Sequence, residues 1–224
     1  MPTVLEIGPA TVRTLGGRSG NRPDAATVAA ALDGIDDPIA LLDARPVEVW
    51  NLWRVLIASI LGECRGPVVV LHPSWWSAAR LDRVVEAVAA TGGRVVTMSR
   101  SELIISDRPA GAVIELAAEL VAVCSGSSVR VLDRSDGESV ADVAAELAGT
   151  DEVLLDAGVA DWAQSAEEIR QALWQRGVVA RDVDIAAVAA SAFPTRRRPP
   201  RPVKAFVAAS AALLALAGGV TVAG

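Results

Sequence analysis

The 224-residue sequence predicts an α/β fold, and two observations indicate it. Hydrophobic residues make up 52% of the chain and aromatic residues only 4%, so the core must be built mostly from Ala, Val, Leu and Ile. Short apolar segments typical of strands alternate with segments of helical periodicity, and Gly and Asp turns separate them. The length suits one domain of ordinary size or two small ones.

The first half of the chain predicts a hairpin followed by helices and strands in turn. TVLEIG (3–8) and TVRTLGG (11–17) form two short strands around a Gly-Pro turn. Asp24 is expected to cap a helix over 25–35. We then expect a buried strand over 38–43, a helix over 46–63 with Pro46 in its first turn, a strand leading into a loop over 66–76, a helix over 77–93 and a strand over 94–99. Apolar residues spaced by three and four predict the buried face of the second helix: Trp50, Trp53, Leu56, Ile57, Ile60 and Leu61.

The second half begins at 110–137 with strand-like segments that no helical segment separates. This pattern predicts two or three consecutive strands joined by tight turns. The remaining elements alternate again: a helix over 139–147, a strand over 152–158, a helix over 165–177, a strand over 178–183 and a short helix over 184–193. The hairpin-like start therefore recurs near residue 112. This recurrence indicates that the chain is a duplication of one unit.

Charge and cysteine content exclude several classes of protein. Five of the 21 basic residues, and none of the 27 acidic ones, lie in 194–224. The rest of the chain is strongly acidic, so we expect no nucleic-acid partner, because phosphates would be repelled. Cys64 and Cys124 lie in apolar stretches without a spacing pattern, which predicts buried free thiols and a reducing compartment. Residues 1–20 lack the pattern of a signal peptide.

The C-terminal residues predict a membrane anchor. AFVAASAALLALAGGVTVAG (205–224) has no charge, and a helix of this length spans about 30 Å, the thickness of a bilayer's hydrocarbon core. The Arg- and Pro-rich linker at 194–204 precedes it, and the positive-inside rule places that linker in the cytoplasm. We therefore expect a cytoplasmic domain over 1–193 and a single transmembrane helix in the inner membrane. A buried helix of a soluble fold is the alternative, and either a tail anchor or a longer protein cut at the membrane fits the sequence.

The opening stretch LEIGPATVRTLGG has a strand, the acid Glu6, the glycine Gly8 and a second strand. It resembles the first phosphate-binding hairpin of the actin/Hsp70/sugar-kinase superfamily, whose two halves each begin in this way. The later strand end HPSWW, the helix after it, the second strand pair, the Arg/Pro linker and the final span resemble the membrane-anchored type VII secretion-associated proteins of mycobacteria and their relatives, over about residues 3–224. The resemblance implies a compact, divergent actin/Hsp70-like (ribonuclease H-like) duplicated domain followed by one transmembrane helix.

The same resemblance implies three turns that hold ATP, and all three have lost residues that this chemistry needs. Pro9 stands where a serine or threonine is expected and removes an N–H donor. The stretch 114–120, where the family has glycines and an aspartate that helps hold Mg²⁺, has no glycine and carries Glu119. The last turn, after the strand that ends at Asp156, keeps Gly158 alone. We therefore expect that ATP hydrolysis is lost and that no cofactor is bound, with ATP and Mg²⁺ as the alternative.

Other candidate residues point to no enzyme class. His72 is the only histidine, so no site built from several histidines exists. A hydrolase using Ser74 and His72 is conceivable, but the G-x-S-x-G motif is absent. Trp75 and Trp76 are either a contact patch for a partner or part of the core. The runs of acidic residues are expected to lie on solvated faces: Asp33, Asp36, Asp37, Glu167 and Glu168. We assign no catalytic, cofactor-binding or metal-binding residue.

These observations together predict a membrane-anchored pseudo-ATPase that binds protein partners. The resemblance implies an accessory or scaffold role in type VII secretion, with components of the secretion system as possible partners. Two alternatives stay open: an active ATP-binding switch of the actin/Hsp70 superfamily, and an unrelated tail-anchored α/β protein-binding module. A full Hsp70 ATPase domain is much longer than residues 1–193, so one or two of its subdomain insertions must be missing.

Overall fold

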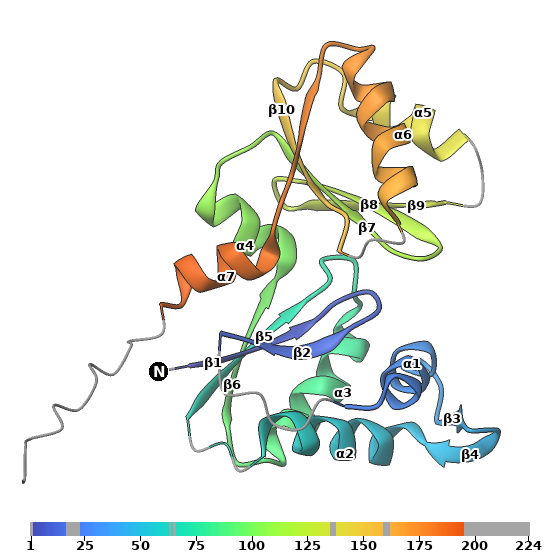
Figure 1. Cartoon of the computed structure of the whole chain (residues 1–224), viewed down its shortest axis with the longest axis vertical. Coiled ribbons are helices and arrows are strands. Elements are labelled where there is room, and N and C mark those ends of the chain that lie inside the picture. Colours follow the sequence, from blue (N-terminus) through green and yellow to red (C-terminus); the bar gives the residue numbers. More distant parts are fainter. Residues whose placement is uncertain are drawn as a thin grey trace, which may run out of the picture.

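The protein forms two lobes, each built on its own sheet, in the computed structural model (Figure 1). Two short helices, α4 and α7, lie between the lobes at one side. The structure describes the following residues: 2–16, 23–62, 64, 66–134, 138–158 and 162–194. The predicted transmembrane helix at 205–224, and the linker at 194–204 apart from Pro194, lie outside them. No helix in this described part is long and apolar enough to cross a membrane.

The N-terminal lobe contains a four-stranded sheet in the order β2-β1-β5-β6. Its strands are β1 (Thr3–Ile7), β2 (Val12–Leu15), β5 (Pro67–His72) and β6 (Arg94–Ser99). β1 and β2 pair antiparallel, whereas β1 with β5 and β5 with β6 pair parallel. Three helices form a core with one face of this sheet: α1 (Ala25–Asp33), α2 (Val49–Leu61) and α3 (Ala78–Ala89). Because side chains alternate along a strand, Leu5 and Val70 face these helices, whereas Val4 and Leu71 face α4 and α7.

The C-terminal lobe contains a five-stranded sheet in the order β11-β10-β7-β8-β9. Three strands form an antiparallel meander: β7 (Ala112–Leu116), β8 (Leu120–Ser125) and β9 (Ser128–Asp133). The other two, β10 (Glu152–Asp156) and β11 (Val179–Asp182), run parallel to β7. Two helices cover one face: α5 (Glu138–Glu146) and α6 (Ala163–Trp174). The meander predicted over 110–137 is confirmed.

The order of the elements repeats in the two halves, in agreement with the predicted duplication. Each half runs from an antiparallel hairpin to two parallel strands and ends in a short helix, α4 (Arg100–Asp107) or α7 (Ile185–Ala192), and these two helices pack together. The side chain of Ser99 caps α4, and that of Asp184 caps α7. The strand registers place Glu6 of β1 and Glu115 of β7 at equivalent positions, since Glu6 pairs with Leu71 and Glu115 with Asp156.

The region 38–63 differs from the prediction. Instead of one buried strand, it forms a two-stranded ribbon, β3 (Ile39–Leu42) and β4 (Arg45–Glu48), and the outward-facing residues of β3 are exposed. Pro46 lies in β4, because Asp43 and Ala44 adopt positive φ and turn the chain back before the helix begins. Trp50 is exposed, so it was wrongly placed on the buried face of α2; Trp53, Leu56, Ile57 and Ile60 are buried as predicted.

Helix α4 was missed by the sequence analysis. Its first turn carries a capping box, in which Ser99 and Glu102 each satisfy a backbone N–H of the other. The S-x-x-E pattern was visible in the sequence. The helix that follows this pattern has only eight residues. This omission matters because α4 begins with Arg100, which lies between the lobes.

Candidate functional site

The structure brings together the turns that the resemblance assigns to ATP. The turn at Gly8 and Pro9, between β1 and β2, and the turn at 117–119, between β7 and β8, line one pocket of about 410 Å³. Gly158, after β10, lies next to them: a Cβ atom on this glycine would be 3.9 Å from Cδ of Pro9. The two lobes therefore face each other across the turns that the sequence singled out.

The first N–H group after each hairpin strand is already used within its own turn. Gly8 N donates to Thr11 O at 2.7 Å, and Ala117 N donates to Leu120 O at 3.0 Å. Pro9 has no N–H to offer. A phosphate cradle needs several free backbone donors that point at the ligand. Neither hairpin turn supplies such a set at these positions.

A buried arginine lies behind these turns and connects the lobes. Arg100 is 2% exposed, and its Nη1 donates to Oε1 of Glu6 at 2.7 Å. Its Nε and Nη2 donate to the two carboxylate oxygens of Asp156, at 2.7 and 2.9 Å. The second carboxylate oxygen of Glu6 accepts from Nε of Arg13 at 2.5 Å. Glu6 belongs to the N-terminal lobe and Asp156 to the C-terminal lobe, so a single guanidinium joins them.

The electrostatics of this cluster keep Arg100 charged. Burial alone would lower the pKa of its guanidinium, but the charges and hydrogen bonds of Asp156 and Glu6 outweigh burial and raise the pKa. The bidentate contact with Asp156 fits the planar fork of an arginine and would not form with a lysine. Loss of Arg100 would leave two buried carboxylates without their shared cation.

Glu115, the counterpart of Glu6, has a different environment. Its Oε2 accepts from Ser74 N at 3.0 Å, and its Oε1 accepts from the Ser74 hydroxyl. Ser74 Oγ accepts in turn from Ser101 N at 3.0 Å. Burial raises the pKa of Glu115 to about 7, and the charge of Asp156 adds to this, although the Ser74 hydrogen bonds and Arg100 act in the opposite direction. Burial and the charge of Glu115 raise the pKa of the nearby Cys124 thiol to about 12.

The structure gives no support to the hydrolase alternative. His72 Nδ1 lies 2.9 Å from Pro73 O, and burial lowers the pKa of its imidazole. In the described part of the chain, the hydroxyl of Ser74 bonds to Glu115 and Ser101 rather than to this histidine. Ser74 therefore holds the carboxyl group of Glu115 in place.

Both tryptophans of the pair are half-buried, and only Trp76 packs against the core of the N-terminal lobe. Trp76 packs edge-on against Trp53, with ring centroids 6.5 Å apart. The guanidinium of Arg80 lies 5.3 Å from the ring centroid of Trp75 and also pairs with Asp36. Both tryptophans and Arg80 line the pocket between the turns. The cation on the pocket wall is thus already engaged.

Mg²⁺-ATP does not fit this site. Glu6 and Asp156, which would be available to a metal, are bound by arginines, and Glu115 is buried against Ser74. The pocket wall includes the carboxylates of Asp33 and Glu119, which repel phosphates. Across the described residues, no group of three or more His, Cys, Asp or Glu side chains is arranged to hold a metal ion. The contacts therefore provide neither the metal site nor the phosphate site of an ATPase.

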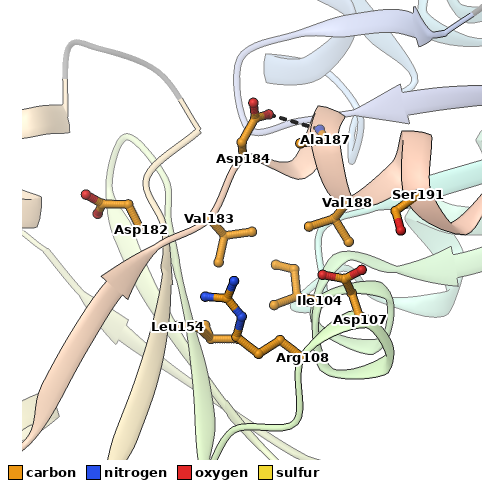
Figure 2. Close-up of a pocket in the computed structure, with 10 residues that line it drawn as sticks. All are labelled: Ile104, Asp107, Arg108, Leu154, Asp182, Val183, Asp184, Ala187, Val188 and Ser191. Atoms are coloured by element: carbon orange, nitrogen blue, oxygen red, sulfur yellow. Dashed lines mark hydrogen bonds between the residues drawn. The ribbon is translucent and has the colours of Figure 1, made fainter.

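A second pocket, of about 360 Å³, lies between α4 and α7 (Figure 2). Its apolar wall includes Ile104 and Val188, and Arg108 extends along one side. Three acids line it, and two of them have partners: Asp184 Oδ1 accepts from Ala187 N at 3.2 Å, and Asp182 pairs with an arginine of α6. The third is Asp107, at the end of α4. The pocket is lined by residues of both equivalent helices, which also pack against each other.

The sequence analysis named Glu6, Gly8, Pro9, Glu119, Asp156 and Gly158, and the structure places all of them around the cleft between the lobes. It missed Arg100 as a site residue, although this side chain organises the cluster. The partners of Arg100 are 94 and 56 residues away along the chain, so no local pattern could identify them.

Comparison with known proteins gives distant structural likenesses only. No protein-family model matches the chain, and no curated protein sequence matches it. The crystal structure of ethanolamine utilization protein EutJ from Carboxydothermus hydrogenoformans is similar, with a TM-score of 0.43, 10% identity and coverage of 84% of this chain and 86% of that one. An AlfA filament bound to AMPPNP is similar with a TM-score of 0.44, 12% identity and coverage of 80% and 88%. Since both scores lie below 0.5, the account of the fold rests on the strand order and the duplication within the chain.

Proposed function

We propose that this chain is a pseudo-ATPase: a divergent member of the actin/Hsp70-like superfamily that binds proteins and neither binds nor hydrolyses ATP. Support comes from the duplicated order of strands and from the three turns that meet at the cleft. In the two hairpin turns, the N–H groups of Gly8 and Ala117 are bonded within the turn, and Pro9 has no N–H. A scaffold role follows, because the two-lobed architecture is kept while the chemistry of the cleft is not.

The observation that carries the proposal is the position of Arg100. Its guanidinium is buried between one carboxylate of each lobe, at 2.7 Å from both. A protein side chain here supplies the positive charge that acidic residues of an ATPase cleft take from a metal ion. Because Arg100 is covalently part of the chain, the two lobes are held together without any ligand. A nucleotide-driven opening and closing of the lobes would have to break these contacts each time.

The cellular setting belongs to the proposal as well. We place the domain on the cytoplasmic side of the inner membrane, anchored through residues 205–224, as an accessory protein of a type VII secretion system. The support is the uncharged run at 205–224, the basic linker before it and the resemblance of the sequence. Fractionation of cells that express the full chain, and of cells that express it without 205–224, tests the anchor. Recovery of both forms in the soluble fraction would contradict it.

Thermal unfolding of the full chain with millimolar ATP or ADP, with and without Mg²⁺, tests the pseudo-ATPase proposal. A ligand at about 100 times its dissociation constant stabilises the folded state by about 2.7 kcal/mol, which raises the midpoint by several degrees. We expect no change of the midpoint with either nucleotide. A clear rise that requires Mg²⁺ would favour the active switch instead.

A further inference from the structure

The β3–β4 ribbon carries two exposed apolar side chains of the N-terminal lobe. It extends from the end of α2 beside α1 (Figure 1). Ala40 is buried against the lobe, whereas the side chains of Ile39 and Leu41 point outward and are 48% and 68% exposed. In the described part of the chain, the ribbon has two strands and pairs with no other sheet. Two strands alone are marginally stable, and a free edge with apolar side chains is typical of contact sites.

The turn determines which backbone groups of the ribbon face outward. Asp43 and Ala44 both adopt positive φ, with values of 50° and 60°, as a type I′ turn requires. In a hairpin with a two-residue turn, the two residues that flank the turn form a hydrogen-bonded pair; here they are Leu42 and Arg45. Along the strands, hydrogen-bonded pairs then alternate with pairs that are not hydrogen-bonded to each other. The bond from Val49 N to Pro38 O, at 3.0 Å, agrees with this alternation. The N–H and C=O groups of Ile39 and Leu41 therefore point away from β4.

The two edges of the ribbon are not equivalent. On β4, the residue opposite Leu41 is Pro46, which has no N–H, so that edge cannot form a continuous ladder. On β3, Ile39 and Leu41 each offer an N–H and a C=O, and no hydrogen bond to these groups is seen among the described residues. Only the β3 edge is suited to accept another strand.

The surroundings of the β3 edge favour positive charge in the partner. A pocket of about 400 Å³ at the base of the ribbon is lined by Ile39, Trp50 and three acids: Asp37, Glu48 and Glu86. Arg83 also lines it, with its Nη1 donating to the carbonyl oxygens of Ile35 and Asp37 at 2.5 and 2.7 Å, so the lining carries three acids and one base. Asp43 adds a further acid at the turn. These charges also disfavour self-pairing, because the antiparallel register that uses both Ile39 and Leu41 places Asp37 opposite Asp43 of the other copy.

We infer that the β3 edge binds an extended segment of a partner protein that has apolar residues two positions apart and Lys or Arg at both ends. The backbone of the segment adds a third strand, its apolar side chains cover Ile39 and Leu41, and its cations face the acids around the ribbon. This inference rests on the proposed role as a protein-binding module and names the chemistry of one partner. Nucleotide binding concerns the cleft and peptide binding concerns the ribbon, so each can fail without the other.

Fluorescence anisotropy with the full chain and the labelled peptide KKTVTVTKK tests the inference. We expect saturable binding that weakens at least about tenfold in Leu41→Pro, because this change removes an outward N–H but no bond to β4. The double variant Glu48→Lys, Glu86→Lys should weaken binding by a similar factor. Val55→Thr, on the exposed face of α2 outside the ribbon, is the matched control and should bind like the wild type.

Three results would overturn the inference: no binding at millimolar peptide, equal affinity for the acidic peptide EETVTVTEE, or equal affinity of Leu41→Pro and the wild type. Leu41→Thr provides a second variant if Leu41→Pro unfolds, because threonine keeps the strand and removes the apolar contact. It should weaken binding about threefold. An unchanged affinity in Leu41→Thr would also count against the inference.

Discussion

The two halves of this protein share one order of strands and helices but neutralise the equivalent acid of their first strand in different ways. In the N-terminal half, Glu6 is paired with the guanidinium groups of Arg13 and Arg100. In the C-terminal half, Glu115 bonds to the hydroxyl and backbone N–H of Ser74. One acid is satisfied by charge and the other by neutral donors. The position of the acid is thus the same in the two halves, while its partners differ.

This difference explains how the cleft is closed without a ligand. Arg100 is the first residue of α4, and Ile185 is the first residue of the equivalent helix α7. Both are buried, but only the first is a cation that reaches across to the other lobe. The N-terminal half therefore contributes the charge that holds the lobes together. The C-terminal half contributes Asp156 and a carboxyl group that titrates near neutrality.

The largest expected effect is that of Arg100→Met. Removing the shared cation leaves Glu6 and Asp156 buried and short of a partner, which should lower the free energy of unfolding by about 3–5 kcal/mol. Arg13→Met is the matched control, because Arg13 also pairs with Glu6 but is 53% exposed. Its loss should cost less than about 1 kcal/mol. Urea denaturation measures both, and equal costs would show that Arg100 does not carry the interface.

The second effect concerns pH and Glu115. Its folded-state pKa lies above the usual 4.5, near 7, so the folded state holds this proton more tightly than the unfolded state. Stability that comes from this group is complete below pH 4.5 and is lost as the pH rises to about 7. Glu115→Gln removes this dependence, so the variant should gain about 3 kcal/mol relative to the wild type between pH 4.5 and pH 8.

Urea denaturation at several pH values between 4.5 and 8 measures this change. Glu119→Gln, an exposed acid in the turn after β7, is the control and should follow the wild type at every pH. Parallel curves for Glu115→Gln and the wild type would show that Glu115 is ionised normally in the folded protein.

A smaller effect is expected from Ser74→Ala. The hydroxyl of Ser74 connects Glu115 of one lobe with Ser101 of α4, so its loss should cost about 1–2 kcal/mol. It should also raise the pKa of Glu115 further, because a donor to the charged form is removed. Ser106→Ala is the control, because the hydroxyl of Ser106 is on the helix surface and donates to Leu103 O of its own helix. This change should lower the free energy of unfolding by less than about 0.5 kcal/mol. If the two variants are equally stable, Ser74 does not link the lobes.

The smallest effect compares the equivalent helix caps. Ser99→Ala and Asp184→Ala each remove a side chain that accepts backbone N–H groups at the start of α4 or α7. Each should lower the free energy of unfolding by about 1 kcal/mol. Similar costs would support the equivalence of the two helices. A cost for Ser99→Ala several times larger would mean that the cap also positions Arg100.

Local patterns predicted most of the fold but not its central contact. The two hairpins, the alternation of strands and helices and the cap at Asp24 follow from side-chain alternation, turn residues and helix ends. The prediction that Pro46 begins a helix was wrong, because a proline fits an edge strand as well as the first turn of a helix. Arg100 could not be assigned at all, since its partners come together only when both lobes fold.

Calorimetric titration of the full chain with ATP and ADP, with and without Mg²⁺, is the most direct test of whether the cleft binds a nucleotide. We expect no heat of binding up to millimolar nucleotide, because Arg100 occupies the space between the acids and the first N–H group of each hairpin turn is bonded within its own turn. Micromolar binding that depends on Mg²⁺ would contradict it, and Arg100 would then have to leave Glu6 or Asp156 when the nucleotide enters.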